Sequence, residues 1–126
     1  MKTKPIMISS SIFLGILGIL LTFIPDEIVS SLSVASNPIS TLSLQLLGAI
    51  YFGFAMLNWM AKGTLIGGIY NKPIAIGNFT HFTIGGLALI KIITEINAHT
   101  EIIIFLTVFY VIFAVLFAYI FKTNPT

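Results

Sequence analysis

The sequence contains neither cysteine nor arginine. Without cysteine, the chain cannot form disulfides, thiolate metal sites or thiol redox centres. Without arginine, it lacks the forked guanidinium group that binds phosphates and carboxylates through two parallel hydrogen bonds. Its six lysines are spread along the whole chain and form no basic stripe, so we exclude nucleic-acid binding.

Charged residues of any kind are also scarce. They make up 8% of the sequence, whereas soluble domains contain about 25%, and hydrophobic residues make up 57%. A chain of this composition has too few polar groups to cover a surface in water. Its length suits a single domain, so we predict one membrane domain over residues 1–126.

Four segments are long and apolar enough to cross the roughly 30 Å of hydrocarbon in a bilayer, which takes about 20 residues of helix. They are residues 6–24, 41–61, 73–94 and 102–121. The short links between them make consecutive helices antiparallel neighbours. The predicted fold is therefore all-α, a polytopic membrane protein with an antiparallel bundle of four transmembrane helices. The links are expected to be a polar loop at 25–40, a glycine-rich loop at 62–72 and an acidic turn at 95–101.

The lysines predict how the chain is oriented, because lysines near span ends favour the cytoplasmic side. Five of the six fall at the N-terminus, in the second link and at the C-terminus, while all four acids lie in the first and third links. We therefore predict a multi-pass protein of the cell (inner) membrane with both termini in the cytoplasm. The first apolar run has 19 residues, longer than the roughly 7–15 of a signal peptide, so we expect it to remain as a span.

Each predicted span carries small and polar residues at helical spacing. Helices in lipid associate through small residues and interhelical hydrogen bonds, so we expect these stripes to face inward. They comprise Ser11, Gly15, Gly18 and Thr22; then Thr41, Gln45, Gly48, Phe52, Ala55, Trp59 and Lys62, flanked by Tyr51 and Asn58; then Gly77, Asn78, His81, Gly85, Ala88, Lys91 and Glu95; and finally Thr107, Tyr110, Ala114 and Ala118. The other side of the third span carries Ile76, Phe79, Phe82, Ile90 and Ile93.

The depths of these polar groups, counted at about 1.5 Å per residue from each span's midpoint, predict two layers. The inner layer, on the cytoplasmic side of centre, contains serines 9–11, Asn58, Asn78 and His81. The outer layer contains Gln45, Lys91 and Glu95. Lys91 has a side chain long enough to reach the outer surface, and Glu95, four residues on, is its expected partner.

His81 is the strongest candidate for function, because an ionisable side chain inside a span indicates a functional site by default and imidazole titrates near neutral pH. The alternative is a neutral histidine that holds the helices in register. Trp59 has two interpretations as well: with Asn58 and Lys62 it could clamp a lipid headgroup, or it could anchor the span at the membrane surface. The candidate ligand-binding residues are His81, Asn78, Asn58, Gln45, Tyr51, Trp59, Lys91 and Glu95. No metal-ligand set and no catalytic triad is evident.

The stretches GILGILLTFIPDEIVSSLS and LLGAIYFGFAMLNW combine a first span that closes on a proline and two acids with a second span that opens on a small-residue run. This pattern resembles the DoxX-like group of small four-helix membrane proteins, over the first two spans. The resemblance implies a four-helix membrane bundle, and some members accompany quinone-linked or redox membrane complexes. Acidic or arginine residues found in parts of that group's second span are absent here, so no functional residue is carried over.

Two classes of function remain open from the sequence. The first is a non-enzymatic accessory subunit or binder of a lipophilic ligand, a lipid or a quinone-like molecule, with a membrane protein or a second copy as partner. This class predicts a pocket near Asn58, Asn78 and His81. The second is a small proton-linked transporter or carrier that uses His81. Enzymatic activity ranks last, and no tightly bound cofactor other than such a ligand is expected.

Overall fold

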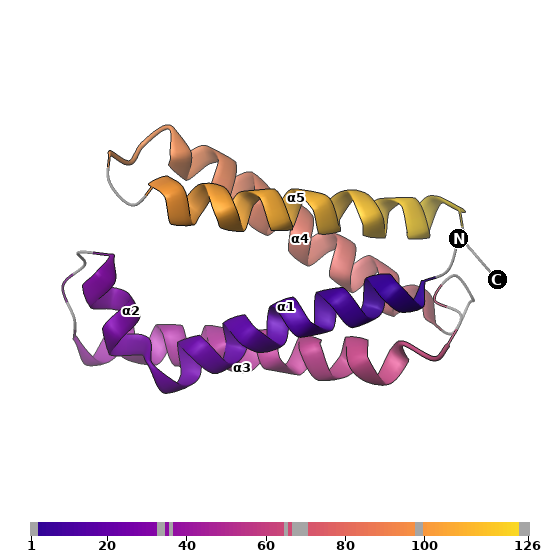
Figure 1. Ribbon diagram of the computed structural model, residues 1–126, viewed down its shortest axis with the longest axis horizontal. Coiled ribbons are helices and arrows are strands. Elements are labelled where there is room, and N and C mark those ends of the chain that lie inside the picture. Colours follow the sequence, from indigo (N-terminus) through magenta and orange to yellow (C-terminus); the bar gives the residue numbers. More distant parts are fainter. Residues whose placement is uncertain are drawn as a thin grey trace. The chain divides into compact units, whose positions relative to one another are not determined.

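The computed structural model of the chain is all-helical in the residues it describes, which are 3–32, 35, 37–64, 66, 71–97 and 100–123 (Figure 1). The helices are α1 (Lys4–Phe23), α2 (Pro25–Ser31), α3 (Pro38–Ala61), α4 (Lys72–Ile93) and α5 (Thr100–Thr123). Four of them, α1, α3, α4 and α5, are long and apolar enough to cross a membrane. The all-α prediction and the four long apolar segments are confirmed, and no predicted boundary is more than three residues from the observed one.

The start of α3 illustrates why the boundaries shift. The Asn37 side chain accepts hydrogen bonds from the backbone of Ile39 and Ser40, each at 2.9 Å, and Ser40 Oγ accepts one from the Asn37 backbone at 3.1 Å. This capping box satisfies backbone groups that a helix start leaves unpaired, and Pro38 suits the first helical position. The helix therefore begins three residues before the apolar run that predicted it.

Helix α2 is a correction to the predicted loop at 25–40. Pro25 opens this short helix, and Pro25 and Val29 are its buried residues. The Thr41 hydroxyl, in the first turns of α3, donates a hydrogen bond of 2.7 Å to Asp26 Oδ1. A single turn or two of helix with mixed polar residues has no apolar period long enough to be recognised in the sequence.

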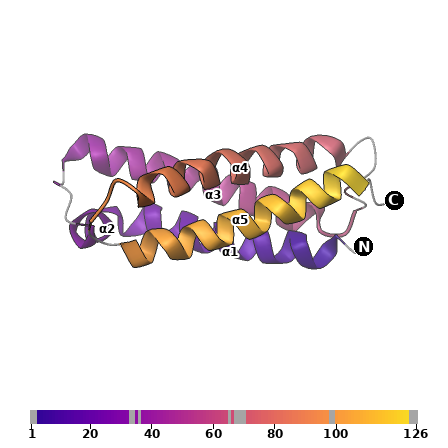
Figure 2. The same ribbon diagram turned by 90° about the horizontal axis from the view of Figure 1, so that it is seen from above.

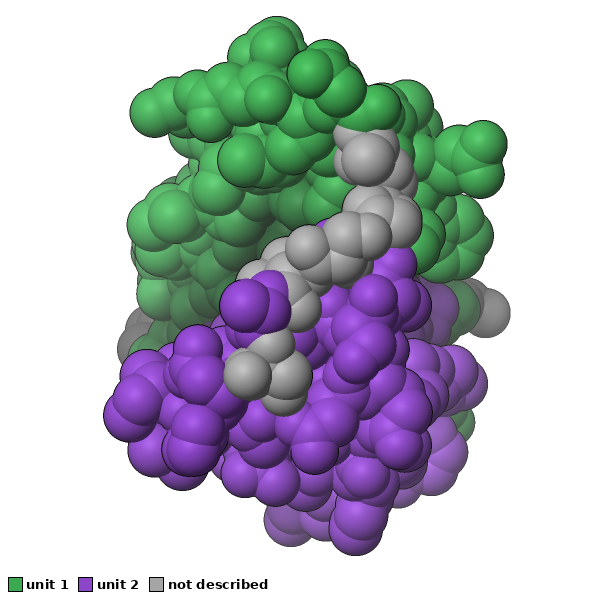
Figure 3. Space-filling view, turned by 90° about the vertical axis from the view of Figure 1, so that its left-hand side faces the viewer, with its two compact units in different colours: residues 1–6, 63–126 green, residues 7–62 purple. Residues whose placement is uncertain are grey.

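The chain divides into two compact units (Figure 3), which we call the N-terminal unit (residues 7–62) and the C-terminal unit (residues 63–126 with 1–6). In the N-terminal unit, α1 and α3 run antiparallel, because contacts that move forward along α1 move backward along α3. Ser11 meets Ala55, Gly18 meets Phe52, and Thr22 meets Gly48. The helices lie side by side in both ribbon views (Figures 1 and 2).

Glycines bring these two helix backbones together. A Cβ atom on Gly18 would lie 2.8 Å from the backbone nitrogen of Phe52 and 2.9 Å from the carbonyl oxygen of Gly48. A Cβ on Gly48 would in turn lie 2.9 Å from the Gly18 carbonyl oxygen. No side chain fits at such distances, so close backbone packing requires glycine at both positions. The prediction that the first-span stripe faces a neighbouring helix is confirmed for α3.

In the C-terminal unit, α4 and α5 form a second antiparallel pair. The Phe82 ring lies 5.0 Å from that of Phe113 and 5.9 Å from that of Phe117, between ring centroids, and Lys72 lies near Phe121. Phe82 has no exposed surface. Its assignment to the side away from the polar stripe was therefore wrong.

The buried face of α4 runs through Ala75, Asn78, Phe82 and Gly86. Around the helix axis, this face is rotated by about one residue position from the predicted stripe, which ran through His81 and Gly85. Burying a phenylalanine ring removes far more apolar surface than burying glycine or alanine does, so the aromatic side chain occupies the centre of the contact.

Candidate functional site

The C-terminal unit contains a hydrogen bond between an imidazole and a phenol. Tyr110 Oη on α5 lies 3.1 Å from His81 Nε2 on α4, and the ring centroids are 5.3 Å apart. Tyr110 is 2% exposed, whereas His81 is only partly buried. The more accessible member of this pair, which we call the His81–Tyr110 pair, is therefore the imidazole.

Gly85 makes room for the phenol. A Cβ atom at this position would overlap the Tyr110 ring. Because Gly85 follows His81 by about one helical turn, both lie on the same side of α4. The space over Gly85 therefore places the Tyr110 hydroxyl against the imidazole.

Phe82 forms the apolar support of the pair. Its ring stands edge-on to His81, with centroids 4.9 Å apart and planes at 68°, and edge-on to Tyr110 at 5.2 Å and 71°. Edge-to-face contacts of this kind are favourable arrangements of aromatic rings. Phe113 and Phe117 continue the cluster along α5. The pair is thus held between two helices by packed aromatic rings.

Asn78 lies one turn before His81 and has no exposed surface. Its Nδ2 donates a hydrogen bond of 2.9 Å to the carbonyl oxygen of Ile74, one turn back in the same helix. This bond satisfies a donor of the buried amide within its own helix. The prediction that Asn78 is sheltered is confirmed.

Asn58 has a different partner, in the N-terminal unit. It is fully buried, and its Nδ2 donates a hydrogen bond of 3.1 Å to Ser10 Oγ on α1. Ser10 Oγ donates in turn to the carbonyl oxygen of Met7 at 3.1 Å, and Ser11 Oγ donates to that of Ala55 at 2.7 Å. The bonds of Asn58 to Ser10 and of Ser11 to Ala55 join α1 to α3, as small polar residues do between membrane helices. The predicted inner layer is therefore divided between the units, with Asn58 in one and Asn78 and His81 in the other.

Trp59 and Lys62 interact with each other at the end of α3. Lys62 Nζ lies 4.0 Å from the centroid of the Trp59 ring and donates a hydrogen bond of 3.2 Å to the Trp59 carbonyl oxygen. The indole is 45% exposed. A lysine folded back over a tryptophan at a helix end fits the interpretation of Trp59 as a surface anchor. Gln45 is exposed and Tyr51 is half-buried on the same helix.

The predicted ion pair of Lys91 and Glu95 is not formed. Both side chains are exposed, and in the described part of the chain no ion pair joins them. Helix α4 ends at Ile93, and the Glu95 backbone bonds to Ile92 in a turn. Because Glu95 lies beyond the helix, the four-residue spacing no longer places it next to Lys91.

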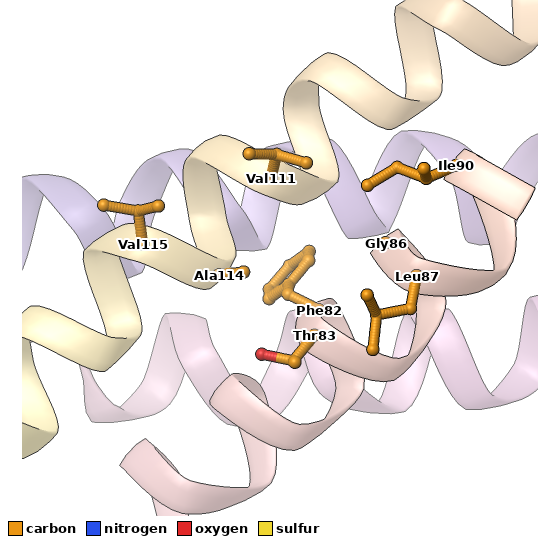
Figure 4. Close-up of a pocket in the computed structure, with 8 residues that line it drawn as sticks. All are labelled: Phe82, Thr83, Gly86, Leu87, Ile90, Val111, Ala114 and Val115. Carbon is orange, nitrogen blue, oxygen red and sulfur yellow. The ribbon is translucent and has the colours of Figure 1, made fainter.

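An apolar pocket of about 130 Å³ opens between α4 and α5 (Figure 4). Its lining residues are Phe82, Thr83, Gly86, Leu87, Ile90, Val111, Ala114 and Val115. Neither His81 nor Asn78 belongs to this lining. Thr83 Oγ1 is buried and has no hydrogen-bond partner in the structure as described. The pocket is smaller than the roughly 300–1,000 Å³ of sites that enclose a whole ligand.

Tyr110 was expected in the inward stripe of the fourth span but was not included among the candidate site residues. The available signal was a phenol in the middle of an apolar segment, since a buried tyrosine hydroxyl normally has a partner. Its partner could not be identified without knowing which face of α4 it meets. No group of three or more potential metal ligands is found in the described ranges.

Comparison with known proteins does not assign this arrangement to a family. No family model, no curated protein and no solved structure matches the chain.

Proposed function

We propose that this chain is an integral protein of the cell membrane, with four spans in one bundle and both termini in the cytoplasm. The four long apolar helices support membrane insertion, because each is at least 20 residues long and has few charges. The lysines at the helix ends support the orientation. The likeness of the first two spans to the DoxX-like group is consistent with a bundle of this size.

We further propose that the protein is a non-enzymatic accessory subunit or carrier of a lipophilic ligand, a lipid or a quinone-like molecule, bound at the His81–Tyr110 pair. The hydrogen bond of 3.1 Å between Tyr110 Oη and His81 Nε2 carries this proposal. It places the one imidazole of the spans at the middle of α4, oriented by a buried phenol and partly exposed at the surface of the helix pair. Polar groups placed on an otherwise apolar wall are typical of sites for lipophilic ligands.

The same bond also supports the alternative, a small proton-linked transporter. A neutral imidazole and a phenol can each give or accept a proton in a hydrogen bond, and histidine chains form proton relays in membrane carriers. The ligand-binding proposal is preferred because no carboxylate occurs near the middle of any span to balance a protonated imidazole. Under the carrier alternative, replacement of His81 by glutamine abolishes transport while ligand content stays unchanged.

The ligand-binding proposal is tested by native mass spectrometry of the protein extracted in lipid nanodiscs. The wild type is expected to retain a lipophilic molecule, and His81→Phe is expected to lose most of it. Thr80→Val serves as the matched control, because Thr80 is an exposed residue next to His81 on the same helix. A wild type that carries only bulk lipid in bulk proportions would contradict the proposal.

A further inference from the structure

We infer that the ligand of the His81–Tyr110 pair is uncharged and presents a hydrogen-bonding oxygen, carbonyl or hydroxyl, on an apolar body. This inference rests on the proposed ligand-binding function and specifies the chemistry of its ligand. It depends on the positions of the charges in the chain and on the groups that surround the pair.

The charges nearest to His81 on its own helix are Lys72 and Lys91, nine positions before it and ten after it. At 1.5 Å per residue these positions lie about 14 and 15 Å away along the helix axis. On α5, the charged residues Glu101 and Lys122 lie nine positions before Tyr110 and twelve after it. No full charge on either helix therefore reaches the pair.

The first two spans cannot supply a charge either. Between Pro5 and Ile24, and again between Pro38 and Ala61, the sequence has no lysine, aspartate or glutamate. The first two spans therefore add no charge at the depth of the bilayer centre. A charged ligand group at this depth would lose its hydration without gaining an opposite charge, which is the costliest situation for an ion in a membrane.

The groups that are present match a neutral oxygen. A neutral imidazole has one donor and one acceptor nitrogen, and the tyrosine hydroxyl both donates and accepts. The pair can therefore bond a carbonyl oxygen or a hydroxyl without a change in net charge. The rings of Phe82, Phe113 and Phe117, which are buried behind the pair, add no polar group to it.

Tyr110 and Gly85 act as positioning residues in this site. The Tyr110 hydroxyl orients the imidazole, and Gly85 leaves the space that the phenol ring occupies. Loss of the hydroxyl should weaken binding of an uncharged ligand by about three- to tenfold, the range expected for one hydrogen bond. Binding of charged probes should be unaffected, because it does not involve the pair.

The test compares matched probes on the purified protein in nanodiscs. Dioleoylglycerol and dioleoyl phosphatidic acid have the same chains and differ by one phosphate, and a decyl benzoquinone replaces the glycerol ester and hydroxyl oxygens by ring carbonyls. We expect the wild type to bind at least one of the two uncharged probes about a hundredfold more tightly than phosphatidic acid. If one uncharged probe binds more tightly than the other, the preference shows whether the bonded oxygen belongs to a glycerolipid or to a quinone.

The variants are His81→Phe, Tyr110→Phe and the control Tyr119→Phe, which removes a hydroxyl from an exposed tyrosine of the same helix. Binding of the uncharged probe should fall in the first two and remain in the third. Tyr110→Phe keeps the ring, so it remains informative if His81→Phe does not fold. This inference is overturned if phosphatidic acid binds as tightly as diacylglycerol, or if all variants bind the uncharged probe with equal affinity. Either result would leave the proposed binding of a lipophilic ligand intact. Absence of both co-purified ligand and probe binding overturns the proposed function itself.

Discussion

The two helix pairs of this protein are held together in different ways. In the N-terminal unit, glycines bring the backbones of α1 and α3 into contact, and serine hydroxyls and one amide bond across the interface. In the C-terminal unit, aromatic rings separate α4 from α5, and the described polar bond between them joins two side chains, Tyr110 and His81. The side-chain pair of the N-terminal unit, Asn58 and Ser10, is fully buried, whereas His81 is partly exposed. This difference in accessibility is why the proposed ligand site lies in the C-terminal unit.

The largest effect is expected at the glycine contact of the N-terminal unit. Gly18→Ala should lower the free energy of unfolding by about 1–3 kcal/mol, because the new methyl group meets backbone atoms that cannot rotate away. Gly53→Ala is the matched control, since a Cβ there has no atom within 4 Å. It should be neutral or stabilise by up to about 1 kcal/mol through helix propensity. Unfolding of both variants in mixed micelles measures the difference, and equal stabilities would refute the close contact.

The next largest effect on stability is expected at Gly85 in the C-terminal unit. Gly85→Ala should cost about 1–2 kcal/mol, less than Gly18→Ala, because the obstructing group is a side chain that can shift. The shift should break the Tyr110–His81 bond. In a Tyr110→Ala background the same substitution should cost little, since the clash is removed, and this double-mutant cycle isolates the contact. An equal cost in both backgrounds would contradict the described packing.

The next effect concerns the hydrogen bond between Asn58 and Ser10 in the N-terminal unit. Asn58→Ala should destabilise by about 0.6–1.7 kcal/mol, the range measured for hydrogen bonds between membrane helices. The partner Ser10→Ala should show coupling with it, because their side chains bond at 3.1 Å. Ser43→Ala should show none with Ser10→Ala, since the Ser43 hydroxyl donates to the Ile39 carbonyl oxygen within its own helix. Additive effects of Asn58 and Ser10 substitutions would exclude the interhelical bond.

The smallest effect is expected at the end of α3. Lys62→Gln removes a cation from above the Trp59 ring and should cost about 0.5–1 kcal/mol, as exposed cation–π contacts do. Lys122→Gln is the control, because that exposed lysine lies at the end of α5. Tryptophan fluorescence should shift only in Lys62→Gln, since Trp59 is the sole tryptophan of the chain. Identical spectra in the two variants would argue against the contact.

Much of the N-terminal unit was predictable. Gly15, Gly18 and Thr22 recur at helical spacing, and residues 12–24 are otherwise apolar, so this side of α1 was expected to be the packing side. The start of α3 and the existence of α2 were not predictable in the same way. The start of α3 depends on the cap that the Asn37 side chain makes, which hydropathy does not register. Helix α2 is too short to show an apolar period.

The C-terminal unit was predicted less well. The third span has glycines, an asparagine and a histidine over a broad arc, and Phe82 lies at its edge. Small-residue spacing pointed to His81 and Gly85 as the centre of the contact, whereas burial of a large ring moved the centre to Phe82. The predicted Lys91–Glu95 pair does not form because the helix ends before it includes both residues.

The sequence by itself determined that the chain has four long apolar helices and that no charge lies near their middles, because length, hydropathy and charge are properties of each segment alone. Only the tertiary structure decided which side of α4 meets α5, that Tyr110 is the partner of His81, and that Asn58 bonds to Ser10. These facts depend on which side chains of another helix fill the same space, and no single segment contains that information.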